Sequence, residues 1–365
     1  MVMNIMNNNK IYIDGSQGEG GGQVLRSSLS LSMCLGTPIE VSNIRAGRKK
    51  PGLLRQHLTC VRAAQEVCGA QVQGDGLRSQ RIEFIPGKIK SGRFRFSIGT
   101  AGSTTLVFQT IFPALLMADD ISEVTLHGGT HNGSAPSYDF LKHSFLEVLI
   151  RQGVEFESEL IHAGFYPNGG GEWHCRVQPL KRMRALNLSK RQALVSRLAR
   201  TFSSGVPNHV SERELKQVTK KLLWSSDELM SVNAKSVSAG NIISLRLNYE
   251  SHSELFEEVA QLGVKAERIA GKAINCLKQF EQTTAAVGEH LADQLMIPLA
   301  LFSGGRYKTH ALSLHSKTNI EVINRFIPNA ICLEKDNDDV VVSVNGQQRY
   351  QAHASSSTEV GKVFE

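Results

Sequence analysis

The chain has 365 residues, 41% of them hydrophobic, with 32 glycines and a formal net charge of +7, a composition that fits a loop-rich globular α/β protein of about two domains. No apolar run approaches the roughly 18 residues of a membrane-spanning helix, and the N-terminal stretch lacks the apolar core of a signal peptide; this argues against membrane and secreted proteins, and we expect a cytoplasmic protein. The six cysteines are scattered without a CxxC or a metal-ligand spacing, which favours reduced core thiols over disulfides or a zinc site.

The first predicted element is a short strand, residues 10–13, which stops at Asp14 in a glycine-rich turn. Five of the next eight residues are glycines, which allow positive φ angles and a close approach of backbone amides to a ligand. A helix predicted over 23–35 follows, and its free N–H groups and dipole favour an anion. Glu19 is placed to hold a hard cation that bridges phosphate oxygens, with Arg26 one helical turn further on. The motif is neither a Walker loop nor the dinucleotide fingerprint, so by itself it indicates phosphate binding or tight packing.

A pattern of glycine turn, helix, strand, polar loop, helix and strand then recurs three times along the chain. The first copy contains helix 23–35, strand 38–44 and helix 52–68; the second contains helix 103–118, strand 122–127 and helix 137–152; the third contains helix 289–302, a strand and loop at 306–316, and helix 318–326. A glutamine four residues before a proline recurs in the second and third copies, at Gln109 and Gln294. This internal match supports a repeat.

The domain organisation follows from where this rhythm is interrupted. A hairpin is predicted at 156–178, and the run from about 182 to 282 mixes strand and helix patterns outside the repeat. We therefore predict three repeated α/β units, each a helix pair on a four-stranded sheet, in a large domain. That domain is formed by residues 10–181 and 283–340, with 182–282 as a smaller α/β domain inserted in the third unit. Residues 341–365 are predicted to be a C-terminal tail, in which a strand ending at 344 is followed by loose polar residues.

The positive charge is concentrated in two places. Residues 181–225 hold eleven Lys/Arg against Glu212 and Glu214, a net charge of +9 that exceeds the charge of the whole chain. A second cluster surrounds a glycine-proline loop: Arg45, Arg48, Lys49, Lys50 and Arg55. Such patches suit a polyanion. The 181–225 run is either an RNA contact or a solvated face.

The third polar loop carries the strongest candidate for a nucleophile. Thr318 and Glu321 have capping-box spacing, so a helix is predicted to begin there, with His315 just ahead of its N-terminus. The positive end of the helix dipole favours a neutral, nucleophilic imidazole, and the same N–H groups could hold the phosphate it attacks. The alternative is a structural capping or surface histidine.

Taken together, these motifs resemble the RNA 3′-terminal phosphate cyclase family over roughly residues 10–335. The matching segments are 14–26, 44–57, 102–109, 164–171, 286–294 and 315–320. The resemblance implies an enzyme, a ligase-type nucleotidyl transferase of RNA processing or repair. In this family a histidine attacks the α-phosphorus of ATP and becomes joined to AMP. The AMP then passes to an RNA 3′-phosphate, and the neighbouring 2′-hydroxyl displaces it to give a 2′,3′-cyclic phosphodiester.

The resemblance also implies roles for particular residues. His315 matches the nucleophile, Glu19 matches the carboxylate that binds Mg²⁺ or Mn²⁺, and a third set matches residues around the RNA end or the ATP phosphates. That set is Arg26, Arg45, Arg48 and Gln56. The nucleotide-binding set is Gln109, His290, Leu291, Ala292, Asp293 and Gln294. The implied partner is RNA with a 3′-phosphate end, with no membrane and no obligate protein partner.

Three positions depart from the family's usual residues. The family commonly has an aromatic residue where this chain has His290, so stacking on adenine there is either weaker or made by the imidazole. His131 replaces an acidic residue found in some relatives, and Thr104 varies a position that should tolerate change. None of these departures removes a chemical group that the mechanism needs.

Two other functions remain open on the sequence alone. A ribosome-assembly branch of the same fold lacks the catalytic histidine, and the presence of His315 and Glu19 counts against it. A carboxyvinyl transferase has a related fold that also closes over phosphate-bearing substrates, which fold-level similarity does not separate from RNA cyclisation.

Overall fold

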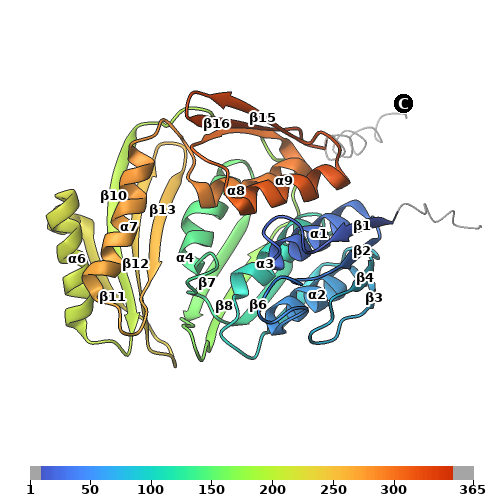
Figure 1. The fold of residues 1–365 in the computed structure, drawn as a ribbon, viewed down its shortest axis with the longest axis horizontal. Helices are drawn as coiled ribbons and strands as arrows, with labels where there is room; N and C mark the ends of the chain where they lie inside the picture. The colour runs from blue at the N-terminus through green and yellow to red at the C-terminus, as the bar shows by residue number, and fades with distance from the viewer. Residues whose placement is uncertain (1–9, 348–365) are drawn as a thin grey trace, which may run out of the picture.

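A computed structural model describes residues 10–347 of the chain (Figure 1). Within this range the strands form four sheets of four strands each, and helices pack against them. The protein is therefore a mixed α/β structure, as the sequence predicted. The C-terminal residues 348–365, which include most of the predicted tail, lie outside the described part of the chain, as do residues 1–9.

Three of the sheets share one plan. The first contains β1 (Ile11–Asp14), β2 (Ile39–Ser42), β4 (Ile82–Ile85) and β3 (Gln71–Gln73), in that order. The second contains β5 (Gly92–Ser97), β6 (Ser122–Gly128), β8 (Gly171–Val177) and β7 (Phe156–His162). The third contains β9 (Leu186–Leu188), β14 (Gly305–Thr309), β16 (Asp339–Val344) and β15 (Ile331–Asp336). In each sheet the first two strands pair in parallel and the remaining pairs are antiparallel.

The fourth sheet, with two helices, forms a module that we call the fourth-sheet module, residues 194–281. It contains β11 (Leu229–Asn233), β10 (Leu194–Ser204), β12 (Gly240–Tyr249) and β13 (Ser253–Val259), with α6 (Asn208–Leu222), η2 (Ser226–Glu228) and α7 (Ala266–Glu281). Its strands follow a different chain order from the other three sheets. The module has a hydrophobic core of its own, in which Ile243 and Leu245 of β12 pack with Ile269 and Ile274 of α7. Figure 1 shows it on one side of the molecule, with α6 at the outer edge.

The remaining helices pack around the other three sheets. They are α1 (Gly22–Leu35), α2 (Arg55–Cys68), α3 (Thr104–Leu116), α4 (Tyr138–Phe140), η1 (Leu141–Phe145), α5 (Leu146–Arg151), α8 (Glu289–Pro298), η3 (Leu299–Ser303) and α9 (Leu314–Phe326). Gly36 and Gly69 end α1 and α2 in the left-handed conformation, at φ 66° and 61°. Helix α1 packs against α9, and α9 packs against α8, so these three helices form the frame of the site described below.

Four predicted helices differ clearly from those observed, and one of them, α9, is described with the site below. Helix α2 begins at Arg55 and not at residue 52, because Gly52 has φ 74° and cannot continue a right-handed helix. The helix predicted over 137–152 is interrupted by a π-helical turn, η1, and the helix predicted over 289–302 ends in one, η3.

The C-terminal part of the described chain was predicted with too little structure. The one strand predicted after residue 335 is observed as β16, which crosses the domain boundary predicted between 340 and 341; the sequence did not predict β15, which forms a hairpin with it. Because β16 also pairs with β14, the ordered fold extends at least to residue 344.

Two further predictions concern the cysteines and membrane-spanning helices. All six cysteines are free; four are buried as predicted, but Cys276 and Cys332 are exposed and do not belong to the core. None of the helices within residues 10–347 combines the length and the apolar character that crossing a membrane requires.

Candidate active site

A cavity of about 640 Å³ lies between helices α1, α3, α8 and α9 on one side and β13 of the fourth-sheet module on the other. Eight of the predicted site residues line it: Glu19, Arg26, Arg48, Gln109, His290, Asp293, Gln294 and His315. They come from remote parts of the sequence and meet because α1 packs against both α3 and α9, and α9 packs against α8. A concave pocket with several converging polar groups is a typical ligand site.

Helix α9 begins four residues earlier than predicted, at Leu314. Its cap is Ser313, whose hydroxyl accepts a hydrogen bond from the Ser316 backbone N–H at 2.9 Å. Thr318, the predicted cap, lies inside the helix, and its hydroxyl donates to the Leu314 carbonyl at 2.8 Å. His315 therefore belongs to the first turn of the helix, where its side chain lines the cavity.

The orientation of the His315 ring is set by a relay of two side chains. His315 Nδ1 lies 2.5 Å from Gln23 Oε1, and Gln23 Nε2 lies 2.9 and 3.1 Å from the two carboxylate oxygens of Asp293. A carboxylate only accepts hydrogen bonds, so the amide nitrogen of Gln23 must face Asp293 and its carbonyl oxygen must face the imidazole. Nδ1 consequently carries the proton, and Nε2 keeps its lone pair for an electrophile.

Asp293 is itself held in place from α9. Asn319 Nδ2 donates to the Asp293 carboxylate at 2.9 Å and to its backbone carbonyl at 3.1 Å, and Ser27 donates to the Asn319 amide oxygen at 2.5 Å. Burial raises the pKa of Asp293, and the hydrogen bond from Gln23 opposes that shift. The resemblance implied that Asp293 belongs to the nucleotide-binding set. In the structure its carboxylate lies behind Gln23 and holds the side chain that hydrogen-bonds to His315.

The glycine-rich turn brings a carboxylate to the start of α1. The Glu19 N–H donates to Thr318 Oγ1 at 2.9 Å, and the Glu19 carboxylate pairs with Arg48. A β-carbon on Gly21 would lie 2.1 Å from Glu19 Oε2, so only glycine leaves room for this carboxylate. A β-carbon on Gly18 would lie 2.1 Å from the Thr318 hydroxyl. The turn is thus packed tightly, and it also forms part of the cavity wall.

Beside this turn lie two basic side chains, the half-buried Arg26 and the buried His57. Burial lowers the pKa of Arg26, and the acidic Glu19 and Asp293 nearby oppose that shift. Burial also lowers the pKa of His57 to about 3, with further lowering by Arg26 and Arg45. His57 Nδ1 accepts from the Leu54 N–H at 3.2 Å, so its proton is on Nε2, the atom that faces Gly22.

Four of the predicted residues do not line the cavity. Arg45 donates to the Lys50 and Gly52 carbonyls at 2.6 and 2.9 Å and thereby holds its own loop. Gln56 Oε1 accepts from the Ser103 N–H at 2.7 Å. Leu291 and Ala292 are fully buried in the core next to the pocket residues of α8.

The opposite end of the cavity is built from α3, α4 and α8. Gln109 and Gln294, the two glutamines of the internal sequence match, hydrogen-bond to each other. The His290 ring stands edge-on to Phe140, with ring centroids 6.5 Å apart, and both residues line the cavity. The cavity lining also includes apolar side chains of these elements, Leu106, Pro113, Phe140 and Ile297.

Sequence reasoning missed Gln23, Asn319, Thr318 and His57 as site residues. Each makes contacts with residues remote in the sequence, and their only local signal was membership of the segments that carried the resemblance.

Comparisons with known proteins agree on one family. The sequence model described as RNA 3′-terminal phosphate cyclase matches residues 17–332. The RNA 3′-terminal phosphate cyclase of Salmonella agona strain SL483 is 46% identical over 335 residues, covering 92% of this chain and 97% of that protein. The protein of the same name from Salmonella typhimurium strain LT2 is 45% identical over 335 residues, covering 92% and 98%. The one from Ectopseudomonas mendocina strain ymp is 44% identical over 337 residues, again covering 92% and 98%.

Proposed function

Since the chain belongs to the RNA 3′-terminal phosphate cyclase family and is an enzyme of that family, we propose that it converts an RNA 3′-terminal phosphate into a 2′,3′-cyclic phosphodiester at the expense of ATP. His315 Nε2 attacks the α-phosphorus of ATP, a nitrogen–phosphorus bond forms and pyrophosphate leaves. An oxygen of the RNA 3′-phosphate then attacks the same phosphorus and frees the imidazole. Finally the 2′-hydroxyl attacks the activated 3′-phosphate, loses its proton, and AMP leaves.

The observation that carries this proposal is the relay from Asp293 through Gln23 to His315. A histidine nucleophile needs a deprotonated nitrogen that faces the substrate, and the relay assigns that role to Nε2 without requiring a strong base. Activation by adenylation is needed because a phosphate monoester dianion has no good leaving group for cyclisation. The arrangement of His315 at the N-terminus of α9 also favours phosphate oxygens beside it.

Positive charge must offset the negative charge of the approaching phosphates. Arg26, Arg48 and the first N–H groups of α1 supply it along one wall of the cavity. Mg²⁺ often binds through one or two carboxylates together with substrate phosphates, and within residues 10–347 no cluster of three or more His, Cys, Asp or Glu forms a metal cage. The single carboxylate of Glu19 fits that mode, and a Mg²⁺ or Mn²⁺ ion held there would neutralise charge on the phosphate oxygens.

The nucleobase of ATP is proposed to occupy the other end of the cavity. Gln109 and Gln294 offer amide groups there, and His290 offers an imidazole face in place of the aromatic ring usual in the family. Leu291 and Ala292 support this wall from the core. Arg45 and Gln56 support the basic loop and the neighbouring turn that the RNA end would meet.

A direct assay tests the proposed function. An RNA oligonucleotide with a 3′-phosphate is incubated with the protein, ATP and Mg²⁺ or Mn²⁺, and its end is then treated with phosphatase. Conversion to a phosphatase-resistant cyclic end, with one AMP and one pyrophosphate released per RNA, is the expected result. Binding of ATP without any turnover would point to a non-catalytic relative, and turnover of phosphoenolpyruvate would point to carboxyvinyl transfer.

We also propose that the chain consists of three repeated units with the fourth-sheet module inserted into the third. The shared strand order of three sheets supports this reading, as does the insertion of residues 194–281 between β9 and β14, which are paired neighbours. The separate hydrophobic core of the module points the same way.

The Gln23 relay makes a quantitative prediction. Gln23→Met keeps the length of the side chain but removes both hydrogen bonds, so His315 is free to rotate and to change tautomer. We expect the rate constant of histidine adenylation to fall about 10- to 100-fold. This is the range seen when a side chain that hydrogen-bonds to a metal-bound histidine is removed. Because a buried carboxylate loses a donor, the free energy of unfolding should also fall by about 1–3 kcal/mol.

Gln65→Met is the matched control, a half-buried glutamine on α2 that does not line the cavity. It should change the adenylation rate constant less than twofold. Rapid-quench measurement of protein-bound AMP gives the rate, and urea unfolding gives the stability. Wild-type adenylation by the Gln23→Met protein would contradict the role of the relay.

The basic run at 181–225 is partly neutralised in the structure. Arg197 pairs with Glu228 at 2.6 Å, Arg200 with Asp139 at 2.8 Å, and Arg213 donates to Glu267 at 2.7 Å. The lysines of α6 are exposed: Lys216, Lys220 and Lys221. Figure 1 shows α6 on the opposite side of the molecule from α1 and α9. We therefore propose that this helix contacts RNA nucleotides remote from the reacting 3′ end.

Reversing those three lysines to glutamate tests this contact. Each lost phosphate contact should reduce the slope of log affinity against log salt by about 0.7 for single-stranded RNA, so the triple variant should lower the slope by about 2. Affinity should fall for RNAs of 15 nucleotides or more and stay unchanged for a trinucleotide. Lys335→Glu, at an exposed lysine of β15, is the control for the effect of reversing one lysine outside α6. An unchanged slope would identify the α6 charges as a solvated face.

A further inference from the structure

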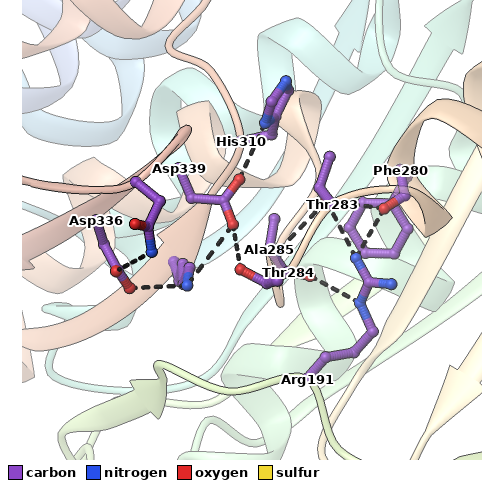
Figure 2. A network of polar contacts seen from close by, with 10 residues as sticks. Arg191, Phe280, Thr283, Thr284, Ala285, His310, Asp336 and Asp339 are labelled. Atoms are coloured by element: carbon purple, nitrogen blue, oxygen red, sulfur yellow. Dashed lines mark hydrogen bonds and ion pairs between the residues drawn. The ribbon is translucent and has the colours of Figure 1, made fainter.

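Two short linkers join the fourth-sheet module to the rest of the protein, residues 189–193 on entry and 282–288 on exit. Arg191 of the entry linker binds the exit linker and the end of α7. Its Nε donates to the Ala285 carbonyl at 2.7 Å and its Nη2 to the Phe280 carbonyl at 2.8 Å, while the guanidinium lies 4.0 Å from the centre of the Phe280 ring (Figure 2). These contacts join the two linkers to each other.

The exit linker is in turn fastened to Asp339, at the start of β16. Thr284 Oγ1 donates to one oxygen of the Asp339 carboxylate at 2.5 Å, and His310 Nδ1 lies 2.9 Å from the other oxygen (Figure 2). The Asp339 side chain is only 5% exposed. Lys308 Nζ lies 3.6 Å from the same carboxylate. A buried carboxylate that holds partners on separate segments fixes the distance between them.

His310 belongs to the loop that leads into α9. Only two residues separate it from Ser313, the cap of that helix, and five positions separate it from His315 in the first turn. The backbone reinforces this connection, because the N–H groups of residues 286 and 287 in the exit linker donate to the Lys308 carbonyl at 3.0 and 2.9 Å. A change in the position of the exit linker therefore changes the position of the loop that leads to the N-terminus of α9.

We propose that Asp339 is a positioning residue that couples the fourth-sheet module to His315 through Thr284 on the exit linker and His310 on the loop before α9. This inference rests on the proposed function, since it assigns His315 the nucleophile's role. A shift of the fourth-sheet module, such as RNA contact on α6 would favour, changes the position of the exit linker. Through Asp339 it then changes the position of the His315 ring relative to Gln23.

Asp339→Asn tests the coupling with little change in volume. An asparagine has one acceptor oxygen, so it cannot accept hydrogen bonds from both Thr284 and His310, and it removes the charge that lies 3.6 Å from Lys308 Nζ, whereas Lys308 keeps its partner Asp336 at 2.7 Å. We expect the rate constant of histidine adenylation at saturating ATP to fall about tenfold, with the Kd for ATP changed less than twofold. Glu334→Gln removes an exposed carboxylate of the same hairpin, which pairs with Arg306, and should leave both values unchanged.

A double-mutant comparison separates coupling from simple loss of structure. Thr284 and His310 share Asp339 as their link, so Thr284→Val and His310→Ala should each slow adenylation several-fold and together slow it no more than the stronger single change. Multiplied losses in the double variant would overturn the proposal, as would wild-type kinetics for Asp339→Asn.

Hydrogen exchange gives a readout that does not depend on catalysis. Thr284→Val and Asp339→Asn should both speed amide exchange of residues 310–316 at least threefold, and Glu334→Gln should not. If the wild-type protein is not labelled by ATP, the proposed function fails, and exchange alone then decides whether the module and the loop are coupled. Unchanged exchange of this segment in Thr284→Val would overturn the coupling.

Discussion

Replacement of His315 by alanine is expected to abolish labelling of the protein by α-labelled ATP and to lower RNA cyclisation by about 10⁴-fold or more, as loss of a covalent nucleophile does in other enzymes. The fold should survive, because the His315 side chain is exposed to the cavity and makes one hydrogen bond, to Gln23. A change at such a position costs about 0.5 kcal/mol or less in the free energy of unfolding.

The measurement is incubation with α-labelled ATP and Mg²⁺ without RNA, followed by tests of the bond that holds the label. A phosphoramidate is labile in acid and stable in alkali, so wild-type label should show that behaviour. His162→Ala, an exposed histidine of β7, should label like wild type. Label on the His315→Ala protein would move the nucleophile elsewhere, with His310 the first residue to examine.

Replacement of Glu19 by alanine is the second change with a large expected effect. The carboxylate is the proposed holder of the divalent ion, and its loss should raise the Mg²⁺ concentration for half-maximal adenylation about 10- to 100-fold. Loss of Glu19 also frees Arg48, which pairs with that carboxylate, so ATP should bind as well as before or better at low metal concentration.

The two effects are measured as a divalent-ion titration of adenylation and as ATP binding by calorimetry. Glu66→Ala, an exposed carboxylate on α2 outside the cavity, is the control and should leave the titration unchanged. A Glu19→Ala protein with the wild-type metal titration would refute the metal role. The carboxylate would then serve mainly to hold the basic loop through Arg48.

Much of the fold could be predicted from local patterns, and the beginning of α9 shows where such patterns fail. Ser313 and Thr318 are both suitable caps, and the carboxylate of Glu321 favoured Thr318. The structure uses Ser313, because the Thr318 hydroxyl accepts from the Glu19 N–H, a residue 299 positions away. Local spacing carries no information about such a partner.

The candidate site shows the same limit. Glu19 could be proposed from its place in the glycine-rich turn, and Arg48 from the basic cluster and the family resemblance. Gln23 could not, since a glutamine in a helix is ordinary until its partners His315 and Asp293 are known. In the same way, a count of positive charges could not show that Arg213 is neutralised by Glu267, 54 residues later.

The packing of α1 against α9 has a consequence for the order in which the protein is made. The glycine turn, its carboxylate and the basic loop leave the ribosome early, but the histidine and Thr318 follow almost 300 residues later. At a rate of protein synthesis of about 5–20 residues per second, this interval lasts tens of seconds. During that time the nascent chain lacks His315 and the helix that packs against the turn, so under the proposed mechanism a truncated chain has no group to accept AMP.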